Sequence, residues 1–440
     1  MTAGLDGGRP QPAHLARKVF SLGRLALLAA CLLGAAAHAA AQERLTIEQA
    51  VAEAAQKNAG LLAEKVNISI AEARVLTARL RPNPVISASG DHLDVLGTGY
   101  NETNGGGPPE YSLRVDFPLE RGGKRGLRTE AARLARSVTE LQFQDALRSI
   151  AAEVATLFVD AQQARDGLNL AKENLTYLEQ IVAVNQARLK AGEIAEVELL
   201  RSRLAALQQR NLVRDAESRR RTALVRLQSA MGRPVPSMTL ELAGELRHDS
   251  AIPPRDQVRE TSLRQRPDLL ALRQDLARAR MEVRSQQAQA KVDPAVGTEY
   301  RRQQGVNGLG NSMGVFLEVP LPVFQRNQGE IERARQEQRQ AELRIRQLET
   351  LIVGEVDFAH EEAAAAEELL RNIEGEMMEQ AREVRRVTEF SYRRGHVTLL
   401  ELLDAQQAYN ATVQGFIEAR AAYARTLYGL DSAAGRTVTQ

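Results

Sequence analysis

One order of features occurs twice in this chain and limits what it can fold into. Residues 113–131 and 317–335 each read as an alternating strand, a proline, a basic turn with Gly or Asn, and a long helical pattern. No proline occurs from residue 119 to 233, or from residue 323 to the end. At ~1.5 Å per residue, the helical pattern over residues 122–190 predicts a rod of roughly 100 Å.

The two halves of the chain are predicted to be duplicates. Residues 188–209 resemble residues 391–412. The matched positions are Gly192 with Gly395 and Pro118 with Pro320. The proline-to-glycine separation is 74 residues in the first half and 75 in the second. Each half therefore predicts a helix, a strand, a loop, a strand, a very long helix, a tight glycine turn and a further helix.

The strands have the pattern of a sheet with one apolar face. Apolar side chains occupy every second position of residues 111–118 and 313–320. Such a pattern is typical of a transmembrane strand or of an antiparallel strand on a globular core. The polar, Gly-rich loops at 94–110 and 303–312 favour the membrane interpretation.

Four strands cannot close a membrane barrel, because about eight is the minimum. An open strand edge is not tolerated in lipid. The sheet is therefore predicted to be completed by other copies of the chain. Two copies would give eight strands and three would give twelve, and the spacing of the strands does not decide between them.

The composition favours thin packing of helix on helix over one thick core. Aromatic residues make up 4% of the chain, there is no Trp, and charged residues make up 26%. The formal net charge of the whole sequence is +2. The first 41 residues contribute about +3, so the net charge of the remaining residues is near −1. This charge argues against a nucleic-acid partner, and we interpret the run Arg219–Arg221 as a solvated helix face.

The N-terminus resembles a secretory leader. Arg17, Lys18 and Arg24 precede an apolar run at residues 25–37, and small residues follow at 38–42. Cleavage after Ala39 or Ala41 would export the mature chain. As an alternative, "LAAC" ending at Cys31 resembles a lipoprotein box, which would make Cys31 a lipidated N-terminus. Otherwise the mature chain has no cysteine and no disulfide.

These features resemble the TolC-like outer-membrane efflux proteins, over about residues 45–430. The resemblance implies a mainly α protein with a small transmembrane β part, located in the outer membrane and extending into the periplasm. It also implies a homotrimer, in which four strands per chain form one twelve-stranded barrel and the helices form a periplasmic α-helical barrel.

The strand-to-helix junctions resemble the CzcC and CusC branch, which serves heavy-metal resistance-nodulation-division (RND) pumps. The similar stretches are "GGKR" at 122–125 and "FQRNQG" at 324–329. The alternative interpretation is that both are basic, turn-forming residues at a membrane interface. The junction residues that we single out are Pro118, Gly122, Gly123, Lys124, Arg125, Pro320, Arg326, Asn327 and Gly329.

Two tight turns are predicted to form the periplasmic tips, which in the family contact an adaptor protein. They contain Ala191, Gly192, Glu193, Arg394, Gly395 and His396. Beyond the second turn, Glu401 and Asp404 are three residues apart and share one helix face. By resemblance they match carboxylates at the closed entrance, about six in a trimer, which would favour cations. The alternative is a solvated acidic face paired with Arg393 or Arg394.

Nothing in the sequence predicts catalysis, a cofactor or a tight metal site. The histidines are scattered, and no nucleophile elbow, zinc-hydrolase motif or nucleotide loop occurs. We therefore expect a passive efflux channel that works with a periplasmic adaptor and, through it, with an inner-membrane RND pump. Its cargo would be heavy-metal cations. The alternatives are drug efflux or type I secretion, and an exported coiled-coil scaffold without a pore.

The duplication also predicts the domain organisation. The expected segments are a signal peptide (1–41), a first equatorial and helical segment (42–83), a first β-hairpin (84–119), a first coiled-coil hairpin (120–231), an equatorial connector (232–266), a helix of the second repeat (267–293), a second β-hairpin (294–321), a second coiled-coil hairpin (322–430) and a C-terminal tail (431–440).

Overall fold

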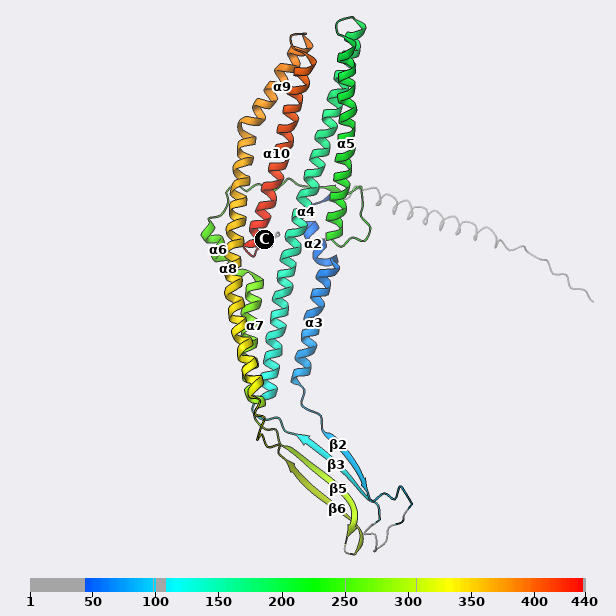
Figure 1. Cartoon of the computed structure of the whole chain (residues 1–440), viewed down its shortest axis with the longest axis vertical. Helices are drawn as coiled ribbons and strands as arrows, with labels where there is room; N and C mark the ends of the chain where they lie inside the picture. Colours follow the sequence, from blue (N-terminus) through cyan, green and yellow to red (C-terminus); the bar gives the residue numbers. More distant parts are fainter. Residues whose placement is uncertain (1–43, 98, 100–107, 250, 306, 438–440) are drawn as a thin grey trace, which may run out of the picture.

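A computed structural model describes residues 44–97, 99, 108–249, 251–305 and 307–437. The predicted leader and Cys31 lie outside these residues. The chain is an elongated molecule with long helices at one end and a small sheet at the other (Figure 1). No helix in the described ranges is both long and apolar enough to cross a bilayer.

The helices follow the predicted duplication. They are α2 (Ile47–Lys57), α3 (Ala59–Arg79), α4 (Lys124–Lys190), α5 (Glu196–Ala230), α6 (Arg255–Gln265), α7 (Pro267–Gln289), α8 (Gln328–Asn372), the π-helical turn η1 (Ile373–Met377), α9 (Met378–Arg393) and α10 (Leu399–Ala433). Helix α4 has 67 residues, which confirms the predicted rod. It packs against α3, α5, α7 and α10 and is the axis of the molecule.

The four long strands form one antiparallel sheet. They are β2 (Val85–Asp91), β3 (Glu110–Pro118), β5 (Ala295–Gly305) and β6 (Gly308–Glu318), in the order β2-β3-β5-β6. The short strands β1 (Arg44–Leu45) and β4 (Glu241–Leu242) pair in parallel elsewhere. The four-stranded sheet thus joins a hairpin from each half, and β2 and β6 are its edges.

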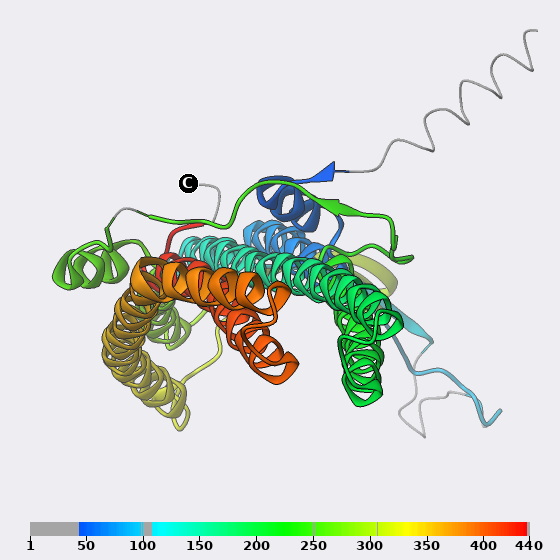
Figure 2. The same ribbon diagram turned by 90° about the horizontal axis from the view of Figure 1, so that it is seen from above.

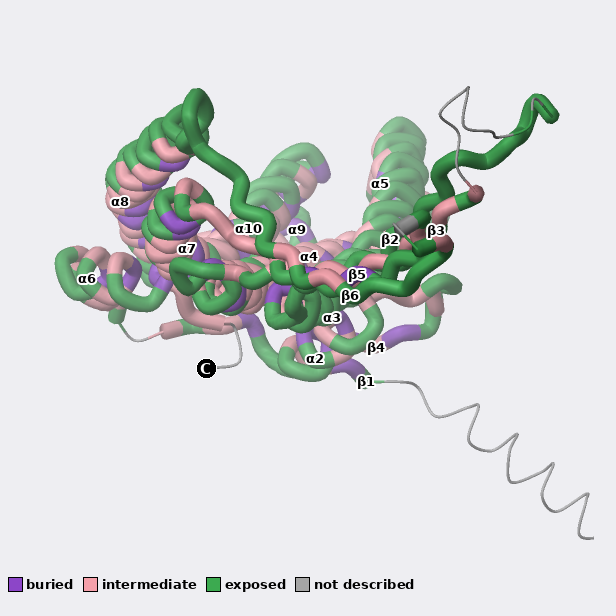
Figure 3. The backbone as a smooth tube through the Cα atoms, turned by 90° about the horizontal axis from the view of Figure 1, so that it is seen from below, coloured by how far each residue is buried: buried purple, intermediate pink, exposed green. Residues whose placement is uncertain are grey.

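The sheet register puts apolar side chains on one face, as the alternation predicted. Ala88, Leu113, Tyr300 and Met313 lie opposite one another across the four strands. Met313 is 74% exposed, and most of the sheet is coloured as exposed in Figure 3. Among the described residues, nothing apolar covers this face.

The buried core lies at the middle of the molecule, which we call the waist. One cluster joins α2, α4, α5 and β4 through residues such as Val154, Phe158 and Leu227. A second joins α6, α7, α8 and α10 around Ile352 and Val356. The predicted second hairpin ends at residue 430, whereas α10 continues to Ala433, because Ala433 and Ala434 are buried in this second cluster.

Buried arginines add polar links at the waist. Arg266 is 4% exposed and pairs with Asp268 and Glu355. Arg148 donates to the carbonyl oxygen of Ser432 at 2.7 Å, which ties the end of α10 to α4. Because buried charges need such partners, the Arg266 pairs fix α7 against α8 within the second half, and the Arg148 contact joins the two halves.

The strand-to-helix junctions are anchored on the end of α7. Lys124 is buried, and its Nζ lies 2.6 Å from both the carbonyl oxygen of Lys291 and Asp293 Oδ2. In the second junction, Asn327 Nδ2 donates to the carbonyl oxygen of Gln286 at 2.8 Å. Both junctions therefore fasten to the segment that leads from α7 into β5.

The junction turns need unusual backbone angles. Gly122 and Gly123 have φ of 72° and 74°, and Asn327 has φ of 59°. A Cβ on Gly122 would lie 2.7 Å from Lys291 Cδ. Gly329 lies inside α8 and is not among the positive-φ residues, so the second turn depends on Asn327 and not on Gly329.

The other singled-out junction residues lie at the ends of the strands or on the surface. Pro118 is the last residue of β3, and Pro320 follows β6. Arg125 is exposed, and Arg326 donates through Nε to the carbonyl oxygen of Pro322. Arg128, which we did not predict, caps the end of α3 by donating to the carbonyl oxygens of Ala78 and Leu80.

Replacing Lys124 tests this anchor. Lys124→Met should lower the free energy of unfolding by about 2 kcal/mol, because Asp293 loses its buried partner. The measurement is denaturant unfolding of the purified protein in detergent. Arg125→Met is the matched control and should change the value by less than about 0.5 kcal/mol. Equal effects of the two substitutions would contradict the anchor.

Candidate functional site

The two predicted tip turns have the same backbone geometry. Gly192 and Gly395 both have φ of 76°. The N–H of Glu193 donates to the carbonyl oxygen of Arg188, and the N–H of His396 donates to that of Ser391. Each helix thus ends in a Schellman motif, in which a left-handed glycine satisfies the last carbonyls. Ala191 precedes the first glycine as Arg394 precedes the second.

A buried hydrogen bond joins the two hairpins near these tips. Tyr392 is 2% exposed, and its hydroxyl donates to Asn185 Oδ1 at 2.6 Å. Burial raises the pKa of Tyr392. The Arg188 guanidinium lies over the same ring at 5.4 Å and pairs with Glu193 at 3.2 Å. The ends of α4 and α9 are therefore held together by one tyrosine and its neighbours.

A second contact between the hairpins lies closer to the waist. The Arg385 guanidinium lies between two rings, 5.1 Å from that of Tyr177 and 4.5 Å from that of Tyr409. Burial raises the pKa of Tyr177 to about 12. The hydroxyl of Tyr177 is buried and has no hydrogen-bond partner in the described structure, so this contact depends on cation–π attraction.

Glu401 caps the N-terminus of α10. The N–H of Thr398 donates to Glu401 Oε2 at 2.6 Å, and the N–H of Glu401 donates to Thr398 Oγ1 at 3.3 Å. This is a capping box. Hydrogen bonds from the backbone and side chain of Thr398 lower the pKa of Glu401. The cap therefore stabilises the helix at neutral pH and loses this effect as the pH falls through the lowered pKa.

The expected arginine partners of Glu401 are engaged elsewhere. Arg393 pairs with Glu389, and Arg394 lies over the ring of Phe390 at 4.1 Å. Asp404 is exposed on the same side of α10 as Glu401 and has no ion-pair partner among the described residues. The described structure thus shows the two carboxylates exposed on one helix face, as the alternative expects, but with threonine and not Arg393 or Arg394 as the partner of Glu401.

The corresponding helix of the first half differs. Helix α5 has Ala195 at its N-cap position and no side-chain cap, whereas α10 has Thr398. Glu198 and Arg201 stand where Glu401 and Asp404 stand in the second half. The paired carboxylates thus belong to one hairpin only, as the sequence predicted.

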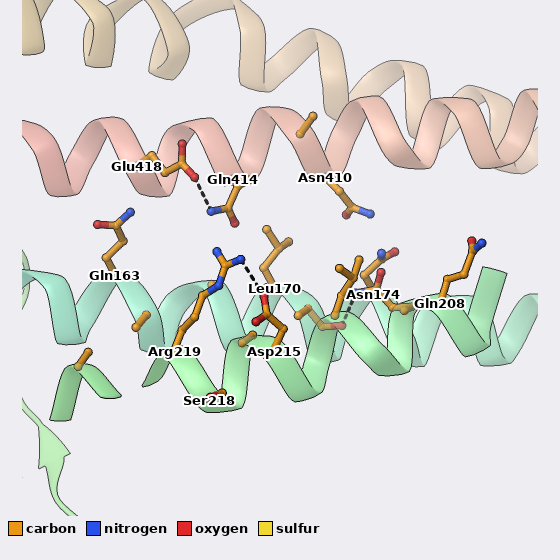
Figure 4. Close-up of a pocket in the computed structure, with 18 of the residues that line it drawn as sticks. Gln163, Leu170, Asn174, Gln208, Asp215, Ser218, Arg219, Asn410, Gln414 and Glu418 are labelled. Atoms are coloured by element: carbon orange, nitrogen blue, oxygen red, sulfur yellow. Dashed lines mark hydrogen bonds and ion pairs between the residues drawn. The ribbon is translucent and has the colours of Figure 1, made fainter. Parts of the chain in front are cut away.

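A polar groove runs between α4, α5 and α10 below the tips. Its volume is about 1170 Å³. Figure 4 shows Asn410, Gln414 and Glu418 of α10 across from Gln163 and Asn174 of α4 and Gln208 of α5. Most of the polar groups are uncharged amides, and the Arg219 in the wall is paired with Asp215 at 2.7 Å. The groove can hydrate a solute through these amides, and the charged side chains in its wall are Asp160, Asp215, Arg219, Arg226 and Glu418.

No group of three or more His, Cys, Asp or Glu side chains in the described residues could hold a metal ion. His248 lies edge-on to Tyr423 at 5.5 Å, and His360 lies 3.1 Å from the carbonyl oxygen of Pro253. These histidines make contacts within the fold and do not converge.

Sequence reasoning missed the residues that join the two hairpins. Asn185 and Tyr392 are 207 residues apart, so no local pattern pairs them. Tyr392 does lie three residues before a tip glycine, but a tyrosine at such a position is equally consistent with an exposed helix face. The capping box at Thr398–Glu401, in contrast, can be read from a Thr and a Glu at that spacing.

Removing the Tyr392 hydroxyl should loosen the tips. Tyr392→Phe leaves the buried Asn185 side chain without a partner, which costs about 1–2 kcal/mol. Amide hydrogen exchange should therefore quicken in residues 181–192 and 388–402. Tyr409→Phe is the control, because the Tyr409 hydroxyl makes no hydrogen bond in the described structure and the ring contact with Arg385 stays. Unchanged exchange at the tips in Tyr392→Phe would refute the link.

Comparisons with known proteins agree with this geometry. The family model described as "Outer membrane efflux protein" matches residues 35–233 and 258–436. The cobalt-zinc-cadmium resistance protein CzcC of Cupriavidus metallidurans is 22% identical, covering 82% of this chain and 83% of the relative. The pyoverdine export outer membrane protein OpmQ of Pseudomonas putida is 26% identical, covering 72% and 67% respectively.

Solved structures share the fold. A membrane protein from Pseudomonas aeruginosa matches with a TM-score of 0.73 at 18% identity, covering 89% of this chain and 90% of that one. A CusC structure matches with a TM-score of 0.69 at 19% identity, covering 89% and 92%. Because the family model matches both halves, the chain belongs to the outer membrane efflux protein family, whose members are outer-membrane channels that extend into the periplasm.

Proposed function

We propose that three copies of this chain form the outer-membrane channel of a tripartite efflux system that exports heavy-metal cations. That the chain is an outer-membrane efflux channel follows from its family. The number of copies, the cargo and the residues that act on it are our proposal. The observation that carries it is a four-stranded sheet with two free edges that continues directly into a curved layer of helices.

Backbone hydrogen bonding supports closure by further copies. The outer edges of β2 and β6 have no strand partner in the described structure. In lipid, each unsatisfied backbone group costs several kcal/mol, so open edges do not persist. Pairing β2 of one copy with β6 of the next satisfies both edges, and three copies give twelve strands. The exposed apolar row that includes Met313 would then face the lipid.

The carboxylates near the tips support a cationic cargo. Three copies would bring Glu401 and Asp404 together as about six carboxylates around the closed end of the channel. Farther along, the amide-lined groove would let a hydrated cation pass without strong binding. The relative CzcC, whose name refers to cobalt, zinc and cadmium, points to the same class of cargo.

The tips are the proposed contact with a periplasmic adaptor protein, through which the inner-membrane pump would act. Ala191, Gly192, Glu193, Arg394, Gly395 and His396 are exposed or partly exposed at the end of the molecule farthest from the sheet. Arg188 lies close to both turns. It pairs with Glu193 in the first, and a Cβ at Gly395 in the second would lie 3.7 Å from Arg188 Nη2. An adaptor protein bound at one tip would therefore also affect the position of the other tip.

A second cargo class is supported by the relative OpmQ, whose name refers to pyoverdine export. An amide-lined groove suits an organic solute as well as a hydrated ion. Family membership argues against the remaining alternative, a coiled-coil scaffold without a pore.

Ion selectivity in planar bilayers tests the role of the carboxylates. The reversal potential in a salt gradient should report preference for cations in the wild-type channel. Glu401→Gln/Asp404→Asn should reduce that preference, because both charges are removed while Gln can still form the capping box. Asp404→Asn alone should give an intermediate value. An unchanged reversal potential in the double variant would show that these carboxylates do not face the pore.

Growth of a deletion strain tests the cargo. Loss of the gene should lower the inhibitory concentration of one or a few among zinc, cobalt, cadmium, nickel, copper and silver. The wild-type gene should restore resistance, and Glu401→Gln/Asp404→Asn should restore it less well. Sensitivity confined to hydrophobic drugs or detergents would contradict a metal cargo.

A further inference from the structure

The segments that join the sheet to the helices all lie at one end of the sheet, and we call them the rim (Figure 1). Residues 80–84 precede β2, and residues 290–294 precede β5. Residues 119–126 follow β3 and include the start of α4, and residues 319–327 follow β6. Because members of the family extend from the outer membrane into the periplasm, we expect the rim at the periplasmic surface of that membrane.

The rim carries an excess of unpaired positive charge. It contains six basic residues but only two carboxylates, Glu120 and Asp293. Glu120 pairs with Arg128 at 2.7 Å. Asp293 pairs with Lys124 at 2.6 Å and also accepts the N–H of Arg121. The other five basic side chains are exposed and have no ionic partner in the described structure: Arg81, Arg121, Arg125, Lys291 and Arg326.

An apolar row continues from the sheet onto the rim. Starting in β6, every second residue is apolar and 46–83% exposed: Met313, Val315, Leu317, Val319, Leu321 and Val323. Strand β6 ends at Glu318, so the last three members of the row belong to the rim. Val319 and Leu321 each precede a proline, which favours extended backbone at both positions. The alternation therefore continues past the end of the strand.

The length of this row fits the apolar band of a membrane barrel. The ten steps from Met313 to Val323, at ~3.3 Å each, give about 33 Å along the chain. At the ~40° tilt of barrel strands, this is about 25 Å across the membrane, which is the height of the apolar band in such barrels. The part within β6, from Met313 to Leu317, would cover less than half of that height. The rim residues are thus needed to complete the band.

Aromatic side chains lie at both borders of this band. Toward the far end of the sheet, Tyr111 and Tyr300 are 54% and 45% exposed. At the rim, Phe324 follows the apolar row and is 91% exposed. Aromatic residues at both borders are typical of membrane barrels. Arg326 comes two residues after Phe324, so the chain changes there from apolar to aromatic to basic.

We propose that the rim binds phospholipids with anionic headgroups, in the leaflet that faces the periplasm. Leu321, Val323 and Phe324 would contact the acyl chains next to the headgroups, and the unpaired basic side chains would contact the phosphates. The partner is a lipid and not free phosphate, because a phosphate ion would leave the adjoining apolar surface exposed to water. This inference uses the proposed lipid-facing side of the sheet, but neither the number of copies nor the cargo.

Charge accounts for the preference for an anionic headgroup. Basic residues beside a membrane surface attract anionic lipids, whereas a zwitterionic headgroup offers them no net charge. The planar guanidinium groups of Arg121, Arg125 and Arg326 also match the geometry of a phosphate. Because these side chains are exposed, high salt should weaken the preference and leave the apolar contact unchanged.

Tryptophan fluorescence tests the apolar contact, because the chain contains no Trp. Phe324→Trp therefore carries the only indole in the protein. The variant is reconstituted in phosphatidylcholine vesicles with increasing fractions of brominated phosphatidylglycerol or brominated phosphatidylcholine, each with bromine near the headgroup. Both lipids should quench its emission. Phe358→Trp is the control, because Phe358 is also exposed but lies on α8 near the waist, and neither lipid should quench it.

The headgroup preference is the second readout. At low salt, half-quenching of Phe324→Trp should need about fivefold less brominated phosphatidylglycerol than brominated phosphatidylcholine, which is the effect of one basic residue near an anionic surface. Adding Arg121→Gln/Arg125→Gln/Arg326→Gln should bring the two fractions close together. High salt should do the same without any further substitution, which keeps the test independent of how well the multiple variant folds.

A matched charge control comes from α5, at one edge of the curved helical layer (Figure 2). Arg203→Gln/Arg214→Gln/Arg221→Gln removes the same charge from exposed positions away from the rim and should leave the headgroup preference unchanged. An equal loss of preference in this control would show that net charge, and not the rim, attracts the lipid.

Met313→Trp separates this inference from the proposed lipid-facing side of the sheet, because Met313 lies within β6. Absence of quenching in both Met313→Trp and Phe324→Trp would contradict that side of the sheet as well as the rim. Quenching in Met313→Trp alone would overturn the lipid contact of the rim. Equal quenching of Phe324→Trp by the two lipids would overturn the selection of anionic headgroups.

Discussion

An open strand edge in a lipid bilayer leaves a row of N–H and C=O groups without hydrogen-bond partners, and the architecture of this chain depends on that constraint. One chain supplies only four long strands, and its sheet ends at β2 and β6. We therefore propose that the sheet is one segment of a barrel formed by several copies. Its apolar face, which no part of the described structure covers, supports the same proposal.

The helical part faces a similar constraint. A layer of helices with apolar stripes on both outer edges is incomplete until those edges are covered. The junctions are fastened to the end of α7 through Lys124 and Asn327, so the sheet and the helical layer are joined at fixed points. At the tips, the Tyr392–Asn185 hydrogen bond holds the two hairpins of one copy together.

Local patterns predicted much of the fold. The long proline-free stretches predicted α4 and the α8–α9 rod, and the alternation in residues 111–118 and 313–320 predicted two of the four strands with the correct faces. The tip glycines were also predicted, because a tight turn between helices needs a positive φ. Each of these features depends on residues that are neighbours in the sequence.

Contacts between distant residues could not be predicted in this way. Nothing near Lys124 indicates Asp293, and nothing near Asn185 indicates Tyr392. Gly329 was singled out with the other junction residues, but it lies inside α8, and Asn327 takes the left-handed conformation there. The basic composition of α5 and the acidic run from Glu355 to Glu379 are visible in the sequence, but only the fold puts them on opposite edges of one layer. To predict site residues that act between copies, the structure of the assembly is needed as well as that of the chain.

The number of chains in the solubilised protein is the most direct test of this account. Native mass spectrometry of the mature protein, released from detergent micelles, measures that number without further assumptions. The account predicts a single main species with the mass of three chains, whose twelve strands leave no free edge. A stable monomer in a lipid-like environment would contradict it, because the edges of β2 and β6 would then be tolerated without a partner.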